Sequence, residues 1–67
     1  MDGDLHVLLA QLPYEHDVLR WRALSGWHRY CIEHARDCVL NFREVPLTIV
    51  VGLEEAVHAM HHAKEGR

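Results

Sequence analysis

The 67-residue sequence has few of the features that stabilise small secreted domains. It contains two cysteines, Cys31 and Cys38, which are too few for a disulfide scaffold. On one helix their seven-residue spacing gives a rise of about 10.5 Å, whereas a disulfide needs Cα atoms about 4.4–6.8 Å apart. Free thiols are typical of a reducing compartment, so we predict a cytoplasmic protein.

Features of enzymes and of membrane proteins are equally scarce. There is a single serine, Ser25, and the four glycines form no phosphate-binding loop. Neither cysteine stands in a recognised pattern with a base and an orienting acid, so we predict a protein with no catalytic activity and no cofactor. The longest apolar stretch, residues 47–53, is far short of the ~20 residues that span a bilayer. The acidic residues 1–4 also lack the basic and apolar regions of a signal peptide.

The net charge and the length of the chain indicate which binding partners to expect. The net charge of −3 does not favour nucleic acid, because non-specific affinity for it comes mainly from neutralised phosphates. A chain of this length buries only about 60% of the surface that it exposes when unfolded, so its core alone is marginal. A partner subunit is the usual support where disulfides are lacking. We therefore predict a single small helical domain, residues 1–67, that forms a homodimer.

The apolar spacing predicts an all-α fold. Four leucines recur at helical intervals over residues 4–12, and Pro13 ends this short helix. A long helix is predicted over 14–42 and a second one over 46–64, which starts at the Val45-Pro46 pair. The two long helices are expected to form a hairpin that pairs with a second copy into a helical bundle. The β-branched residues within 47–51 leave a strand as the alternative there.

The long helix is predicted from a heptad seam, an apolar rhythm of alternating threes and fours that runs unbroken from Tyr14 to Phe42. Its weak point is Ser25-Gly26, because glycine within a helix costs about 1 kcal/mol and can kink the helix or divide it in two. The residues that we predict for the core and dimer contact are Val18, Trp21, Leu24, Ile32, Val39, Phe42, Ile49, Leu53 and Met60.

Two polar and aromatic rows flank this seam and form the predicted partner-binding surface. Arginines repeat every seven residues, which on one helix would give a basic stripe able to clamp carboxylates or phosphates. Large side chains on the other flank are of the kind that dominates binding hot spots. The predicted partner-binding residues are Leu19, Arg22, Trp27, Arg29, Tyr30, Arg36 and Arg43. In the alternative interpretation, the arginines only form surface ion pairs with Glu33, and the N-terminal helix covers the aromatic side chains.

A possible metal site comes from the spacing of Cys31, His34 and Cys38, whose side chains would share one face of a helix. Two thiolates and an imidazole are good zinc ligands, and a further histidine could complete a tetrahedron. The alternative is that both cysteines are core residues, because cysteine is among the most commonly buried residue types.

These observations predict a small regulatory protein-binding module, an adaptor or inhibitor of a larger protein of bacterial or phage type, that acts as a homodimer. The first alternative is a metal-responsive or metal-stabilised regulator that uses Cys31, His34 and Cys38. The second is a nucleic-acid-binding dimer that uses the stripe formed by Arg22, Arg29, Arg36 and Arg43. No membrane association is expected.

Overall fold

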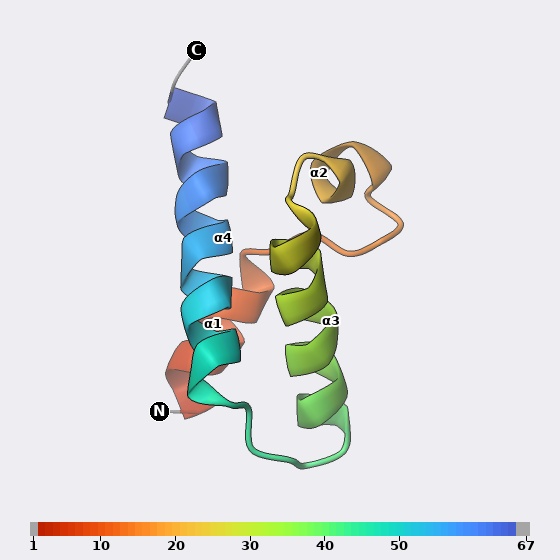
Figure 1. Cartoon of the computed structure of the whole chain (residues 1–67), viewed down its shortest axis with the longest axis vertical. Helices are drawn as coiled ribbons and strands as arrows, with labels where there is room; N and C mark the ends of the chain where they lie inside the picture. Colours follow the sequence, from red (N-terminus) through yellow and green to blue (C-terminus); the bar gives the residue numbers. More distant parts are fainter. Residues whose placement is uncertain (1, 66–67) are drawn as a thin grey trace.

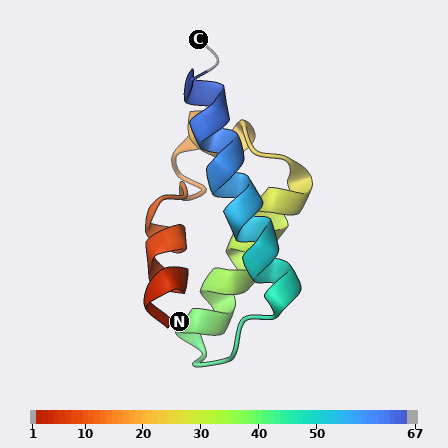
Figure 2. The same ribbon diagram turned by 90° about the vertical axis from the view of Figure 1, so that its left-hand side faces the viewer.

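A computed structural model describes the backbone of residues 2–65 and the side chains of residues 5–61. Its helices are α1 (Asp2–Ala10), α2 (Val18–Arg22), α3 (Gly26–Leu40) and α4 (Leu47–Glu65). The described residues contain no strand, so the all-α prediction is confirmed. Helices α3 and α4 form an antiparallel hairpin, and α1 packs behind it (Figures 1 and 2). None of the described helices combines the length and hydrophobicity that crossing a bilayer requires.

The prediction of one helix over 14–42 is wrong, because the helix is interrupted at Ser25. Residues 14–17 form turns before the short α2, and Ser25 then adopts an extended conformation with φ −71° and ψ 163°. Its hydroxyl accepts a hydrogen bond from the His28 N–H at 3.2 Å, which makes it the N-cap of α3. A serine that caps a new helix, followed by a glycine that weakens helix continuation, divides the seam into two helices that point in different directions (Figure 1).

The other predicted helices have nearly the expected bounds. Helix α1 ends before Pro13, and α4 begins at Leu47, with the Pro46 carbonyl accepting hydrogen bonds from the N–H groups of Ile49 and Val50. Residues 47–51 are therefore helical, and the strand alternative is wrong. Ile49, Leu53 and Ala56 are buried at intervals of four and three residues, which is the period of a helix. Burial of this helical face outweighs the β-propensity of the intervening valines.

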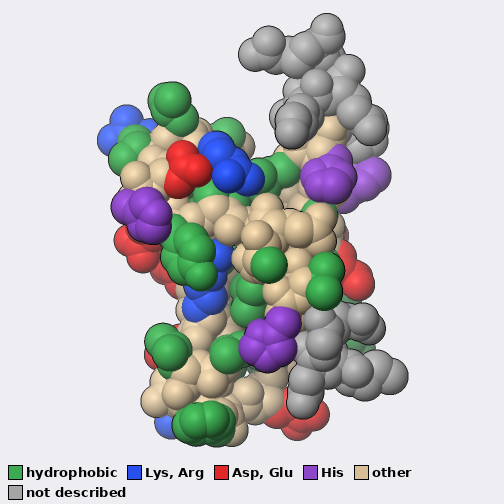
Figure 3. Space-filling model, turned by 180° about the vertical axis from the view of Figure 1, so that it is seen from behind, with side chains coloured by type: hydrophobic (Ala, Val, Ile, Leu, Met, Phe, Trp, Pro, Cys, Tyr) green, Lys and Arg blue, Asp and Glu red, His purple; other side chains and the backbone are tan. Residues whose placement is uncertain are grey.

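The core lies where α1, α3 and α4 meet. Of the predicted core residues, Leu24, Ile32, Ile49 and Leu53 are buried, and Trp21, Val39 and Met60 are partly buried against them. Val18 and Phe42 are exposed instead, because the break at Ser25 turns α2 away and because Phe42 lies beyond the end of α3. Hydrophobic side chains also remain on the surface on the α1 side (Figure 3).

Arg36 joins α1 to α3. Its guanidinium donates hydrogen bonds to the carbonyls of Leu9, Leu12 and Pro13 at 3.3, 3.1 and 2.9 Å. These carbonyls belong to the last turn of α1 and the residues after it, which have no partner within the helix. The guanidinium also lies 3.8 Å from the centroid of the Tyr14 ring. A single side chain thus caps α1, complements its dipole and fixes it to the hairpin.

The turn after α3 has an unusual residue at its apex. The Arg43 N–H donates to the Cys38 carbonyl at 2.7 Å and the Phe42 N–H to the Val39 carbonyl at 3.2 Å, the two hydrogen bonds of a Schellman motif. This motif places Phe42 in the left-handed region, with φ 55°. Glycine is the usual residue there, and an L-residue costs about 1–2 kcal/mol in that conformation.

Candidate functional site

The open side of the hairpin carries a row of stacked rings. Trp27 and Tyr30 stack with their ring centroids 5.8 Å apart, and Tyr30 and His34 stack at 5.7 Å. These three side chains, the aromatic row, recur at intervals of three and four residues along α3, so they lie on one face of that helix. Trp27 is 45% exposed and Tyr30 is 52% exposed, so the row presents a large part of its ring surface to solvent.

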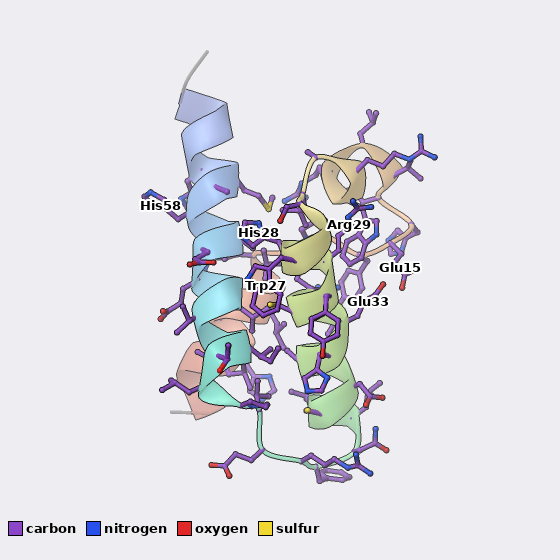
Figure 4. The ribbon with its side chains drawn as sticks, in the orientation of Figure 1. Glu15, Trp27, His28, Arg29, Glu33 and His58 are labelled. Carbon is purple, nitrogen blue, oxygen red and sulfur yellow. The ribbon has the colours of Figure 1, made fainter. Side chains whose placement is uncertain are left out.

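Helix α1 does not cover the aromatic row. It packs on the side of the hairpin opposite the one from which Trp27 is seen in Figure 4. The alternative in which the N-terminal helix buries the exposed aromatics is therefore wrong. The leucines of α1 instead join the core from behind, where Arg36 holds the end of the helix.

Gly52 allows Trp27, the first residue of the aromatic row, to pack against α4. A Cβ atom added to Gly52 would overlap the Cys31 sulfur and would lie 3.3 Å from the indole nitrogen of Trp27. The absence of a side chain at this point therefore allows α3 and α4 to approach closely, and Trp27 rests over the contact between the helices (Figure 4). The ring is consequently held by α4 on one side and by Tyr30 on the other, which limits its rotamers.

Charged groups border the aromatic row. His28 and Glu55 face each other across the two helices, with 3.8 Å between Nε2 and Oε1. Arg29 and Glu33 lie on the edge of α3 away from α4 (Figure 4). The Nε atom of Arg29 lies 3.5 Å from the Ser25 carbonyl, and its two terminal nitrogens donate no hydrogen bond to the described residues. The two terminal nitrogens of the Arg29 guanidinium are thus available for bidentate hydrogen bonds with a carboxylate.

A groove lies between the start of α3 and the second half of α4. Its volume is about 780 Å³, and its walls come from the turn between α2 and α3 on one side and from residues 59–61 on the other. Leu24, Ala59 and Met60 contribute apolar surface, and Arg20 contributes a cation. His28 lines the groove and follows Trp27 in the chain, whereas the three residues of the aromatic row do not line it.

The predicted arginine stripe does not form. Arg22 lies on α2, Arg29 and Arg36 lie on α3, and Arg43 lies in the loop before α4, so the four arginines do not share one helix face. Arg36 is also engaged with three carbonyls and the Tyr14 ring. Leu19 is exposed on α2. The structure therefore brings together Trp27 and Tyr30 from the predicted partner-binding set. Arg29 lies on the edge of α3 away from Trp27, and the others are separated from both.

The cysteines belong to the core of the hairpin. Cys31 and Cys38 are both buried, and burial raises the pKa of the Cys31 thiol, with a smaller contribution from the Glu55 carboxylate. Both effects disfavour the thiolate that a metal requires. Among the described residues no group of three or more histidine, cysteine or acidic side chains could hold a metal ion. His34 instead stacks on Tyr30.

Sequence reasoning missed the roles of Gly52, Arg36 and Phe42. The heptad rhythm places Phe42 in the core, and no glycine or proline marks the turn in which it lies.

Comparison of the chain with family models, with curated proteins and with solved structures gave no match.

Proposed function

We propose that this protein is a non-enzymatic binding module, an adaptor or inhibitor, that acts as a homodimer and grips a larger protein through the aromatic row. The observation that supports the proposal is the exposure of Trp27 and Tyr30 as stacked rings on the side of the hairpin that α1 leaves open. Tryptophan, tyrosine and arginine are the residues that most often dominate binding energy at protein interfaces.

The geometry favours binding because the rings are already ordered. Trp27 is held between Tyr30 and the Gly52 position of α4, and Tyr30 is held between Trp27 and His34. Side chains that are fixed before association lose little rotamer entropy when a partner covers them. The partner is expected to present an apolar surface to the rings and a carboxylate to Arg29, whose fork forms bidentate hydrogen bonds with carboxylates.

The test compares what the wild-type protein and its variants capture from the native host. Tyr30→Ala removes the central ring of the row while leaving the core intact, and Arg29→Ala removes the adjacent fork. Val7→Ala is the matched control, because Val7 is exposed on α1 behind the hairpin. Captured proteins are quantified by mass spectrometry, and the circular dichroism spectrum of each variant verifies its helical content.

We expect one protein to be enriched by the wild type and by Val7→Ala, and to fall at least tenfold with Tyr30→Ala. A tenfold change corresponds to about 1.4 kcal/mol, more than most interface residues contribute. Trp27→Ala is expected to act in the same direction. Equal capture by the wild type, Tyr30→Ala and Trp27→Ala would contradict the proposal, because the exposed rings would then contribute nothing to binding.

A further inference from the structure

Helix α2 has little support in the position that the structure gives it. It consists of five residues, none of which is buried, and the Asp17 side chain makes no capping hydrogen bond. Trp21 packs against the core and is partly buried, whereas Val18 and Leu19 are 50% and 86% exposed. Isolated helices shorter than about 12–15 residues are marginal in water, so α2 would gain stability as part of a longer helix.

Ser25 is the residue at which α2 and α3 are separated. Its φ of −71° is already that of a helix, and its ψ of 163° is not. The chain before it is close to helical, because Ala23 has φ −71° and ψ −17° and the Leu24 N–H donates to the Trp21 carbonyl at 3.2 Å. Rotation about ψ of Ser25 is therefore the main change that would join the two helices.

The side-chain pattern continues across this joint on two faces. On one continuous helix, at 100° per residue, Leu19, Ala23 and Tyr30 lie within about 40° of one another, so Leu19 and Ala23 extend the aromatic row. Trp21 and His28 lie within about 20° of each other on the same basis. His28 faces Glu55 of α4, so Trp21 would face α4 as well.

The groove between α3 and α4 lies where such a helix would run. Helix α4 continues beyond the start of α3 (Figure 1), and the groove of about 780 Å³ separates this part of α4 from the turn between α2 and α3. Ala59 and Met60 form its apolar wall on α4, and Leu24 and His28 line it from the other side. Trp21 would follow Leu24 along the same face, so this chain itself holds a side chain of suitable size and polarity for the groove.

We propose that Ser25 is the joint of a conformational switch, in which α2 and α3 combine into one helix over residues 18–40. In this straight form Trp21 enters the groove and the aromatic row extends to Leu19. The N–H groups of Gly26 and Trp27 donate no hydrogen bond to the described residues in the bent form that the structure shows. In the straight form they donate to the carbonyls four residues earlier. The inference rests on the proposed function, since the straight form presents the longer row to the partner.

Two contacts hold the bent form in the free chain. The hydroxyl of Ser25 accepts the His28 N–H at 3.2 Å, a hydrogen bond that requires the non-helical backbone of an N-cap. Arg36 donates to the Pro13 carbonyl at 2.9 Å. On a continuous helix Val18 lies about 27 Å from Arg36 along the axis, and the chain from Pro13 to Val18 spans at most about 18 Å, so the turn over residues 14–17 must open. A partner that covers Leu19 would favour the straight form, because it binds that form more tightly.

Two substitutions of Gly26 displace the switch in opposite directions. Alanine has the higher helix propensity, so Gly26→Ala favours the straight form, in which this position is a helix interior. Gly26→Pro fixes the bent form, because proline suits the first position of a helix and an extended residue before it, as Ser25 is. Proline inside the straight helix would lack an N–H and clash with the preceding turn. Nothing lies within 4 Å of a Cβ added to Gly26, so the bent form accommodates both side chains.

Hydrogen exchange of the Trp27 amide, followed by NMR on the whole chain, measures the switch without a partner. The protection factor of this amide should be at least about tenfold higher in Gly26→Ala than in Gly26→Pro. Ser25→Ala removes the cap of the bent form and should also raise it above the wild-type value. Equal protection in Gly26→Ala and Gly26→Pro would overturn the inference. An unchanged or lower value in Ser25→Ala would do so as well, because loss of the cap would then only expose the start of α3.

Capture from the native host tests the consequence for binding. Gly26→Pro should capture the partner at least about tenfold less than Gly26→Ala, and Leu19→Ala should lower capture by Gly26→Ala more than capture by Gly26→Pro. Equal capture by the two Gly26 variants would overturn the straight form as the binding form. The exchange measurement needs no partner, and the proposed function is tested by Tyr30→Ala, so the two failures are distinguishable.

Discussion

At the scale of single residues, Arg36 shows how a side chain predicted for a partner serves the fold. It donates to three carbonyls at the end of α1. Hydrogen bonds that involve a charged group contribute about 1.5–3 kcal/mol, so we expect Arg36→Ala to lower the free energy of unfolding by about 2 kcal/mol. Arg36→Lys should recover less than half of that loss, because an ammonium group lacks the planar fork. Urea denaturation measures both variants.

The control for this prediction is Arg22→Ala. Arg22 is exposed on α2, and the described residues make no hydrogen bond or ion pair with it. Its replacement should change the free energy of unfolding by less than about 0.5 kcal/mol. Equal losses for Arg36→Ala and Arg22→Ala would show that the three carbonyl contacts do not stabilise the attachment of α1.

At the scale of helices, Gly52 sets the distance between α3 and α4. Alanine at this position would gain about 1 kcal/mol of helix propensity. Its Cβ would overlap the Cys31 sulfur, and overpacking of a tight contact costs about 1–3 kcal/mol. We therefore expect Gly52→Ala to destabilise the protein by up to about 2 kcal/mol, measured by thermal denaturation.

Replacement of Cys31, whose sulfur the added Cβ would overlap, tests this mechanism. If the overlap with Cys31 causes the loss, the double variant Gly52→Ala, Cys31→Ala should lose less stability than the sum of the two single variants. Gly26→Ala is the matched control, because nothing lies within 4 Å of an added Cβ there. Simple additivity of the Gly52 and Cys31 variants would refute the close approach as the cause.

The helices illustrate how far the sequence predicts the fold. The bounds of α1 and α4 follow from local signals, namely leucine spacing and the two prolines, so they were predicted to within a few residues. The heptad rhythm over 14–42 was misleading, because periodicity cannot distinguish one helix from two that are joined at a cap. Ser25 and Gly26 carried the correct signal, since a serine followed by a glycine favours a helix start over a helix interior.

The candidate site depended on tertiary contacts that the sequence does not display. Exposure of Trp27 and Tyr30 was predicted from their position on the flank of the seam. Their stacking and the support from Gly52 required the arrangement of α3 against α4. The hydrogen bonds of Arg36 depend on where the end of α1 lies in space. The seven-residue repeat of arginines contains no information on that position.

At the scale of the whole molecule, the buried Cys31 links stability to alkaline pH. Burial, with a smaller contribution from Glu55, raises the pKa of the Cys31 thiol in the folded state. The folded chain therefore holds this proton at pH values at which the unfolded chain has released it, and stability falls as pH rises. The effect is absent below the ordinary thiol pKa of about 8.5 and grows above it.

Cys31→Ala isolates the contribution of this thiol from those of all other groups in the chain. At neutral pH the variant is expected to be less stable than the wild type, because it leaves a small cavity in the core. Between about pH 8 and pH 10 the difference should shrink, because only the wild type still loses stability through this thiol. Urea denaturation across this range provides the measurement. A difference that stays constant would mean that the thiol ionises as readily in the folded chain as in the unfolded one, and that the contact between α3 and α4 admits water.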